Sequence, residues 1–141
     1  MFKLIKKELD ASINDFIHHS FEDLCQTYLL YQTKKGNLDG LFFDFQNYRV
    51  ENSPLNRSVE IDIVSEYKDK LLIGECKMTG RKKSLDVLER MIENTTIQPF
   101  ANYKDISFYI FSTSGFTDEL LNKKSKCVHL VDADSMIKGL I

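Results

Sequence analysis

Residues 60–77 read EIDIVSEYKDKLLIGECK, and this stretch decides the fold. In its first half, apolar Ile61 and Ile63 alternate with polar residues, so we expect a β-strand with Asp62 on the face opposite the two isoleucines. Residues 70–78 are more apolar and predict a second strand. A short polar segment separates the two strands, so together they predict a β-hairpin.

The position of the turn sets the pairing of the hairpin. A loop of two or four residues centred on Lys68-Asp69 pairs position i with position 137 minus i. Asp62 then lies opposite Glu75, and Glu60 lies opposite Lys77. A three-residue loop would change the parity and separate Asp62 from Glu75.

The expected pairing brings two carboxylates to within ~5 Å of each other on one face. Like charges in opposite positions destabilise a sheet, and a hard divalent cation would offset them. Magnesium accepts carboxylate oxygens, water and a backbone carbonyl, here that of Cys76. Lys77 could orient a water nucleophile or stabilise a scissile phosphate. The alternative is a solvent-facing polar surface with an ordinary Glu60–Lys77 ion pair.

Periodicity and turn residues predict the remaining elements. A helix is expected over 11–35, ended by Gly36-Asn37. Thr117 is expected to cap a short helix. The other expected elements are a strand at 41–45, a loop at 46–57, a strand at 58–67, a helix at 83–94, strands at 106–112 and 127–131, and a terminal helical turn at 134–141.

Two helices carry expected buried faces. The face of the first helix is expected to hold Ile13, Ile17, Phe21, Leu24, Tyr28 and Tyr31, and that of the second to hold Leu85, Leu88, Met91 and Ile92. The strand at 106–112 is apolar on both faces, which favours a central position between layers of helices. The order α-β-β-β-α-β-α-β predicts a single α/β domain over residues 1–141, with a mixed central sheet flanked by helices.

The composition is that of a soluble globular protein, with 43% hydrophobic and 28% charged residues. No apolar run approaches the ~20 residues of a membrane helix, and the N-terminus is too polar for a secretory signal. We therefore expect a cytoplasmic protein. Cys25, Cys76 and Cys127 are widely spaced and odd in number, so they are expected to be reduced thiols rather than disulfides or zinc ligands.

The segment EIDIV, a short turn and LLIGECK resemble the catalytic hairpin of the PD-(D/E)XK nuclease superfamily, which has a restriction-endonuclease-like fold. In that hairpin an Asp is followed, on the next strand, by Glu-x-Lys. The chain is more specifically similar to the nuclease-like C-terminal domain of archaeal AAA-type (DEXX-box) ATPases. HSFEDLC (19–25) and FYIFSTSGFTDEL (108–120) carry the narrower match, and the resemblance covers about 16–131.

The resemblance implies that Asp62 and Glu75 bind Mg²⁺ or Mn²⁺ and that Lys77 is the catalytic lysine. It also implies that Glu22, which shares a helical stripe with Cys25 and Leu29, completes the site; a surface glutamate is the alternative. The superfamily's nominal proline before the Asp is absent, a common variation. No G-x4-G-K-[ST] phosphate loop is present, so the ATPase half is absent from this chain. The resemblance therefore implies an isolated or excised domain, with an AAA-type ATPase domain as a possible partner.

The implied function is hydrolysis of phosphodiester bonds in DNA. Arg81, Lys82 and Lys83 lie just beyond the motif and are expected to hold the phosphate backbone. The net charge of −2 favours a competing function, a non-catalytic nucleic-acid-binding or regulatory module of an ATPase. RNA cleavage is a third alternative, and the oligomeric state, a homo-oligomer included, stays open.

Five further polar residues are weaker candidates for the site. His18 and His19 are adjacent on a helix and cannot both join one site. His129 alternates within a terminal strand. Ser112 and Ser114 could contact phosphate at a helix N-terminus, but loop capping is the favoured role.

Overall fold

A computed structural model describes the backbone of residues 2–140 and all of their side chains except those at positions 2, 9, 10 and 13–17. The expected order of elements is confirmed, with a helix in place of the expected terminal turn. The elements are α1 (Phe2–Lys34), β1 (Gln46–Val50), β2 (Val59–Tyr67), β3 (Lys70–Lys77), α2 (Leu85–Asn94), β4 (Asp105–Ser112), α3 (Asp118–Leu121), β5 (Val128–Asp132) and α4 (Ala133–Leu140).

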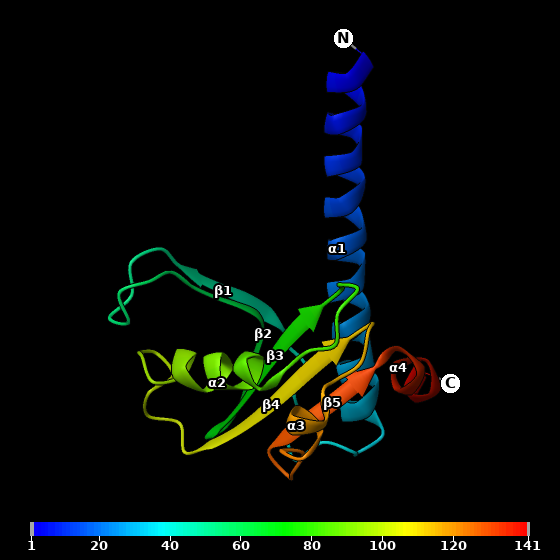
Figure 1. Cartoon of the computed structure of the whole chain (residues 1–141). Helices are drawn as coiled ribbons and strands as arrows, with labels where there is room; N and C mark the ends of the chain where they lie inside the picture. The colour runs from blue at the N-terminus through cyan, green and yellow to red at the C-terminus, as the bar shows by residue number, and fades with distance from the viewer. Residues whose placement is uncertain (1, 141) are drawn as a thin grey trace.

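The five strands form one mixed sheet in the order β1-β2-β3-β4-β5 (Figure 1). The first three strands are antiparallel neighbours, whereas β3, β4 and β5 run parallel. Each parallel connection contains a helix, α2 after β3 and α3 after β4. The predicted α/β fold with a mixed, helix-flanked sheet is therefore confirmed.

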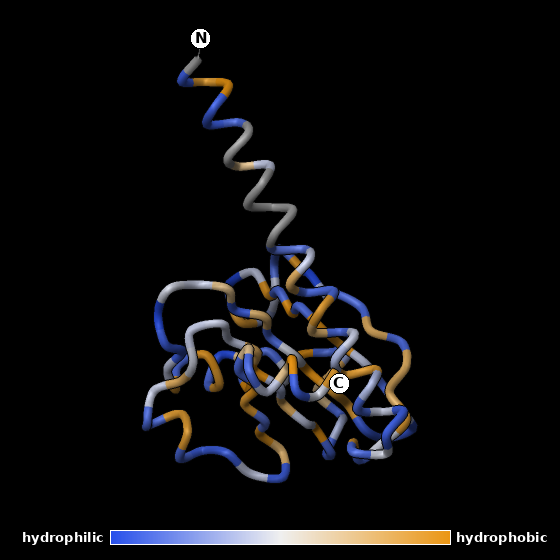
Figure 2. Tube along the Cα trace, turned by 90° about the vertical axis from the view of Figure 1, so that its right-hand side faces the viewer, coloured by the Kyte–Doolittle hydropathy of each residue, from blue (hydrophilic) through white to orange (hydrophobic). Residues whose placement is uncertain are grey.

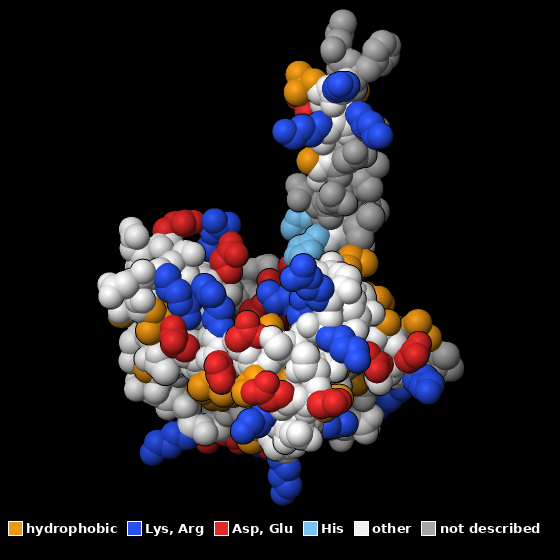
Figure 3. Space-filling model, viewed as in Figure 1, with side chains coloured by type: hydrophobic (Ala, Val, Ile, Leu, Met, Phe, Trp, Pro, Cys, Tyr) orange, Lys and Arg blue, Asp and Glu red, His pale blue; other side chains and the backbone are white. Residues whose placement is uncertain are grey.

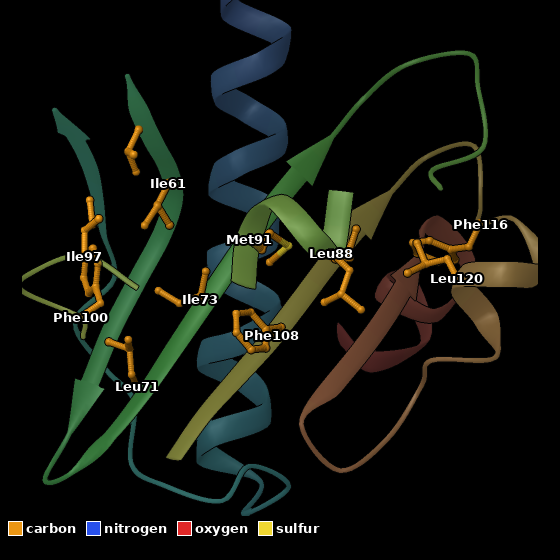
Figure 4. Close-up of a cluster of buried hydrophobic side chains, with 12 residues drawn as sticks. Ile61, Leu71, Ile73, Leu88, Met91, Ile97, Phe100, Phe108, Phe116 and Leu120 are labelled. Carbon is orange, nitrogen blue, oxygen red and sulfur yellow. The ribbon is translucent and has the colours of Figure 1, made fainter. Parts of the chain in front are cut away.

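Each face of the sheet carries its own hydrophobic cluster. The cluster under α2 and α3 contains Leu88, Met91 and Leu120 together with strand residues such as Ile73 (Figure 4). The opposite cluster joins the sheet to α1 and α4 and includes Cys25, Leu29, Leu72, Phe111 and Met136. The expected burial of the 106–112 strand between two layers of helices is confirmed.

Helix α1 begins at Phe2, well before the expected start, and its first part stands clear of the domain (Figures 1 and 2). Its buried stripe is Phe21, Cys25 and Leu29. Leu24 and Tyr31 are exposed, so their assignment to the buried face was wrong. Phe21 and Tyr28 of the expected face do pack in this cluster, so the expected face was rotated only partly away from the true contact line. The side chains of Ile13 and Ile17 lie outside the described residues.

The expected strand at 41–45 was wrong, because the strand is Gln46–Val50. The expected loop at 46–57 is correct only over 51–57. Residues 41–45 run extended beside α1, where the Thr33 hydroxyl donates a hydrogen bond to the carbonyl of Phe42 (2.9 Å). Phe42 is buried and Phe45 packs against the same cluster, whereas Leu41 and Phe43 are exposed. In β1 (QNYRV) the apolar residues Tyr48 and Val50 alternate with polar residues, which gives only a weak strand pattern.

The second helical face was mostly correct. Leu88 and Met91 are buried and Leu85 packs against the same cluster, whereas Ile92 is exposed. Thr117 caps α3 as expected, because its side chain accepts a hydrogen bond from the backbone nitrogen of Leu120. None of the described helices is both long enough and apolar enough to cross a lipid bilayer.

Candidate functional site

The β2–β3 hairpin has the expected register. Ile63 pairs with Gly74 and Tyr67 pairs with Lys70, so the paired positions sum to 137 throughout. The two-residue turn is made possible by Lys68, whose φ of 55° lies in the left-handed region. This register points Asp62 and Glu75 to the same side of the hairpin.

A β-bulge in β2 modifies the expected alternation at Asp62. Between the pairs Gln46–Val64 and Tyr48–Ile61, β1 advances two residues while β2 advances three. Ile61 consequently packs in the cluster under α2, whereas Ile63 packs in the cluster under α1. The expectation that both isoleucines share one face was wrong. Bulges redirect side chains next to active sites, and this one lets Asp62 lie on the α2 face beside the buried Ile61.

Strands β2 and β3 separate where the candidate site begins. Their paired residues end at Ile63 and Gly74, and beyond this point β2 no longer follows β3. Oδ2 of Asp62 accepts a hydrogen bond from the backbone nitrogen of Cys76 at 2.9 Å. The Asp62 side chain thus takes the place of a ladder partner and is held at the point where the strands diverge.

Glu75 is a buried carboxylate beside a second carboxylate. Its side chain lines the same cleft as Asp62 and is only 8% exposed. Burial, followed by the negative charge of Asp62, raises the pKa of Glu75 to about 8, and the positive charge of Lys77 opposes this rise. Such an arrangement favours a bound proton or a bound cation at neutral pH.

Lys77 remains close to this pair. Its Nζ lies 3.6 Å from Oε2 of Glu75, and its side chain is partly exposed. The alternative Glu60–Lys77 ion pair does not form. Glu60 instead pairs with Nη1 of Arg49 on β1 at 2.9 Å, because the bulge has turned this end of β2 away from β3.

Glu22 reaches the site from α1. Its side chain is buried, and burial followed by the charge of Asp62 raises its pKa, while His18, His19 and a hydrogen bond with Asn47 oppose the rise. Nε2 of His18 lies 3.6 Å from Oε1 of Glu22. The role as a solvated surface glutamate is therefore wrong.

Asp62, Glu75 and Lys77 line a cleft of about 730 Å³ between α2 and the diverging ends of β2 and β3. His18 from α1 also lines it, whereas Glu22 is not among the lining residues. In Figure 3 the histidine side chains at the base of α1 border a hollow in which acidic and basic side chains meet. Other residues of the lining are Arg57, just before β2, and Asn94, at the end of α2. Helix α2 adds Asp86, Glu89, Arg90 and Glu93 to the opposite wall.

The expected basic residues lie on a loop that starts at the rim of this cleft. Met78 and Thr79 line the cleft, whereas Arg81, Lys82 and Lys83 are not among its lining residues. The backbone of Lys83 bonds to that of Gly115 and Thr117, which fixes the loop against the segment after β4.

Ser112 and Ser114 form hydrogen bonds that stabilise the loops after β3 and β4. The Ser112 hydroxyl donates to the carbonyl of Gly115 and accepts from the nitrogen of Ser114, and Ser114 also donates to the carbonyl of Thr79. Loop capping is therefore confirmed. His129 stacks on the ring of Tyr109 with centroids 4.3 Å apart, away from the cleft lining.

The donor set suits a hard cation. Asp62 and Glu75 supply carboxylate oxygens, which magnesium and manganese prefer. In a strand the N–H and C=O of one residue point to the same edge, so the carbonyl of Cys76 faces the gap beside Asp62. Among the described residues, no three His, Cys, Asp or Glu side chains converge as a ready ligand cluster. A cation here would rely on two carboxylates, this carbonyl and water.

A family model matches residues 2–90, which span α1 to α2. The chain belongs to the DUF234 family. This family is described as "Archaea bacterial proteins of unknown function". The DUF234 match includes Glu22, Asp62, Glu75 and Lys77, so every proposed catalytic residue lies in the region that defines the family.

Solved structures extend the comparison. The protein of unknown function AF1548 is 16% identical, with a TM-score of 0.52 over 82% of this DUF234 chain, and the chain spans 65% of that protein's length. This likeness shows a shared fold. A repair endonuclease from Pyrococcus abyssi matches at 15% identity and a TM-score of 0.43, over 74% of this chain and 43% of that one.

EndoMS in an EndoMS-dsDNA2 complex matches at 12% identity and a TM-score of 0.42, over 74% of this chain and 41% of that one. TM-scores below 0.5 do not establish a common fold. No curated protein matches the chain.

Sequence reasoning missed several residues of the cleft in this DUF234 protein. Arg57 fell in the expected 46–57 loop, where no periodic pattern pointed to it. Arg90 and Asn94 lie on a correctly expected helix, but their place in the cleft depends on the packing of α2 against β2. The only available signal was the uncommon density of charge along 86–93.

Proposed function

We propose that the protein is a metal-dependent nuclease that hydrolyses phosphodiester bonds in DNA. The observation that carries this proposal is the junction of the β2 bulge with β3. There Asp62, held by the Cys76 backbone, lies beside a buried Glu75 whose pKa is raised to about 8. A pair of carboxylates kept under mutual repulsion has little value as packing, but it suits a divalent cation.

The residues divide the work in the proposed reaction. Asp62, Glu75 and the carbonyl of Cys76 bind Mg²⁺ or Mn²⁺. The bound cation supplies acidification of a water molecule and stabilisation of charge on the phosphate. Lys77, held near Glu75, orients the attacking water or stabilises the negative phosphate oxygens.

Two further groups support this chemistry. Glu22 adds negative charge near Asp62 from α1 and is held by His18 and Asn47, so its role is to position the site rather than to bind the cation. Arg81, Lys82 and Lys83, on the loop beyond Lys77, hold the phosphate backbone of the DNA outside the cleft.

A second candidate is a non-catalytic nucleic-acid-binding or regulatory module of an AAA-type ATPase. The acidic wall of α2 favours it, because Asp86, Glu89 and Glu93 would repel a phosphate backbone. The Asp62–Glu75 pair favours the nuclease, since a module without chemistry gains nothing from closely placed carboxylates.

Plasmid cleavage separates the two candidates. Supercoiled DNA is incubated with the wild-type protein and Mg²⁺ or Mn²⁺, beside Asp62→Ala and a sample with chelator. Cleavage by the wild type alone, and only with metal, supports the nuclease. Absence of cleavage in both metals supports the module, and equal cleavage by Asp62→Ala contradicts the assigned site.

A further inference from the structure

One wall of the cleft holds Arg57, whose guanidinium donates four hydrogen bonds within the protein. Nη2 of Arg57 donates to Oε1 of Glu93 and to Oδ1 of Asn94, both at 2.8 Å. Nε donates to the same Glu93 oxygen at 3.3 Å, and Nη1 donates to the carbonyl of Ser58 at 3.1 Å. The guanidinium therefore joins the segment before β2 to the last turn of α2.

This contact fixes the orientation of the Asn94 amide. Arginine has only donors, so the atom of Asn94 that faces it must be the oxygen. Asn94 is 4% exposed and lines the cleft. Among the described residues its Nδ2 has no hydrogen-bond acceptor, and Ser65 Oγ is the only fully enclosed side-chain atom without a partner. Nδ2 is therefore an oriented, unsatisfied donor that keeps access to the cleft.

The charge around Asn94 selects the kind of group that it can bind. The positive charge of Arg57 is offset by Glu93. The rest of the α2 wall carries Asp86 and Glu89 against the single cation Arg90, so negative charge predominates there. An anionic phosphate is disfavoured there, whereas an uncharged acceptor suits an amide donor. On a nucleic acid the uncharged acceptors are the ring nitrogens and carbonyl oxygens of the base edges.

We infer that Arg57 and Asn94 form a subsite for a nucleobase, in which Asn94 donates to an acceptor on the base edge and Arg57 positions the amide. This inference rests on the proposed function, since it requires a DNA substrate. Arg57 precedes Asp62 by five residues, which an extended chain spans in at most ~17 Å. Asn94 and Asp62 also line one cleft, so the base read by Asn94 lies close to the scissile phosphate.

The test is a selection for base preference without divalent cations, so that binding is measured apart from cleavage. The full-length chain is incubated with a library of DNA duplexes carrying randomised positions, and the bound fraction is sequenced. Asn94→Asp keeps an acceptor for Arg57 but removes both amide donors. Asn102→Asp is the matched control, because Asn102 is exposed on the loop before β4, near the Lys68-Asp69 turn at the other end of the hairpin.

Wild type and Asn102→Asp should enrich the same base at one position, and Asn94→Asp should reduce that enrichment about fivefold or more. Asn94→Ser, which also removes the amide, provides a second variant if Asn94→Asp does not fold. An unchanged preference in folded variants, a uniform loss of affinity, no wild-type preference, or no DNA binding would each overturn the subsite. An Asn94-dependent preference without cleavage in either Mg²⁺ or Mn²⁺ would retain the subsite and reject the nuclease.

Discussion

The carboxylate of Asp62 and the backbone nitrogen of Cys76 are joined by a 2.9 Å hydrogen bond across two strands that no longer pair at this point. The bond fixes an acidic side chain beside Glu75, at the end of β3 that leads to Lys77. It also orients the peptide whose carbonyl we propose as a metal ligand. The bulge in β2 makes this geometry possible.

Glu75 should make the stability of the metal-free protein depend on pH. Its pKa is raised from 4.5 to about 8, so the folded state holds a proton that the unfolded state releases at lower pH. The free energy of unfolding should therefore decrease as pH rises from 5 to 8, by at most ~1.4 kcal/mol per pH unit from this group. Urea unfolding at several pH values in chelator measures the slope.

Glu75→Gln provides the comparison for that slope. Glutamine is uncharged throughout this range, so the variant should lose the contribution of Glu75 and exceed the wild type in stability at pH 8, in the absence of metal. Identical slopes for the two proteins would mean that Glu75 is not held under electrostatic strain.

Lys77→Met should separate binding from chemistry. Methionine keeps most of the apolar stem but removes the charge beside Glu75. We expect DNA affinity and metal binding to remain close to those of the wild type, while cleavage falls by ~100-fold or more. Single-turnover cleavage rates beside equilibrium DNA binding measure the two effects. A parallel loss of affinity and rate would assign Lys77 to binding alone.

The basic loop should contribute affinity instead. Replacing Arg81, Lys82 and Lys83 with glutamine removes three charges and preserves the backbone bonds of Lys83. DNA binding should weaken for all sequences, and the slope of log affinity against log salt should become shallower by up to ~3. Lys123, Lys124 and Lys126 form a matched basic cluster elsewhere, and their replacement should leave the slope nearly unchanged. The reverse result would place the DNA on another face.

Cys76 should be chemically silent although it lies inside the motif. Its side chain is buried in the cluster under α1, where hydrogen bonding with Cys25 and then burial raise the pKa of its thiol. Cys76→Val approximately preserves the volume and should cost no more than ~1.5 kcal/mol, with cleavage and metal dependence retained. Thermal unfolding and cleavage assays check both points. A stable but inactive Cys76→Val protein would indicate a thiol mechanism.

The sequence allowed the hairpin register to be predicted, because apolar alternation and the Lys68-Asp69 turn both specify it. The bulge could not be predicted, since it depends on pairing with β1, and β1 had been expected at 41–45 rather than at Gln46–Val50. The position of Glu22 could be predicted from the sequence, because it shares a helical stripe with Cys25 and Leu29.

The Arg57–Asn94 contact joins residues 37 positions apart, and no local pattern encodes such a contact. Tertiary packing of α2 against the start of β2 creates it, so it could be found only in the folded chain.

The binding of Mn²⁺ tests the central claim most directly. Calorimetric titration compares the wild type with Asp62→Asn and with Glu60→Gln, a control in the same strand and cleft whose carboxylate pairs with Arg49. We expect one Mn²⁺ site in the wild type and in Glu60→Gln, and binding at least ~10-fold weaker in Asp62→Asn. Equal Mn²⁺ affinity in Asp62→Asn and the wild type would contradict a metal site at Asp62 and Glu75.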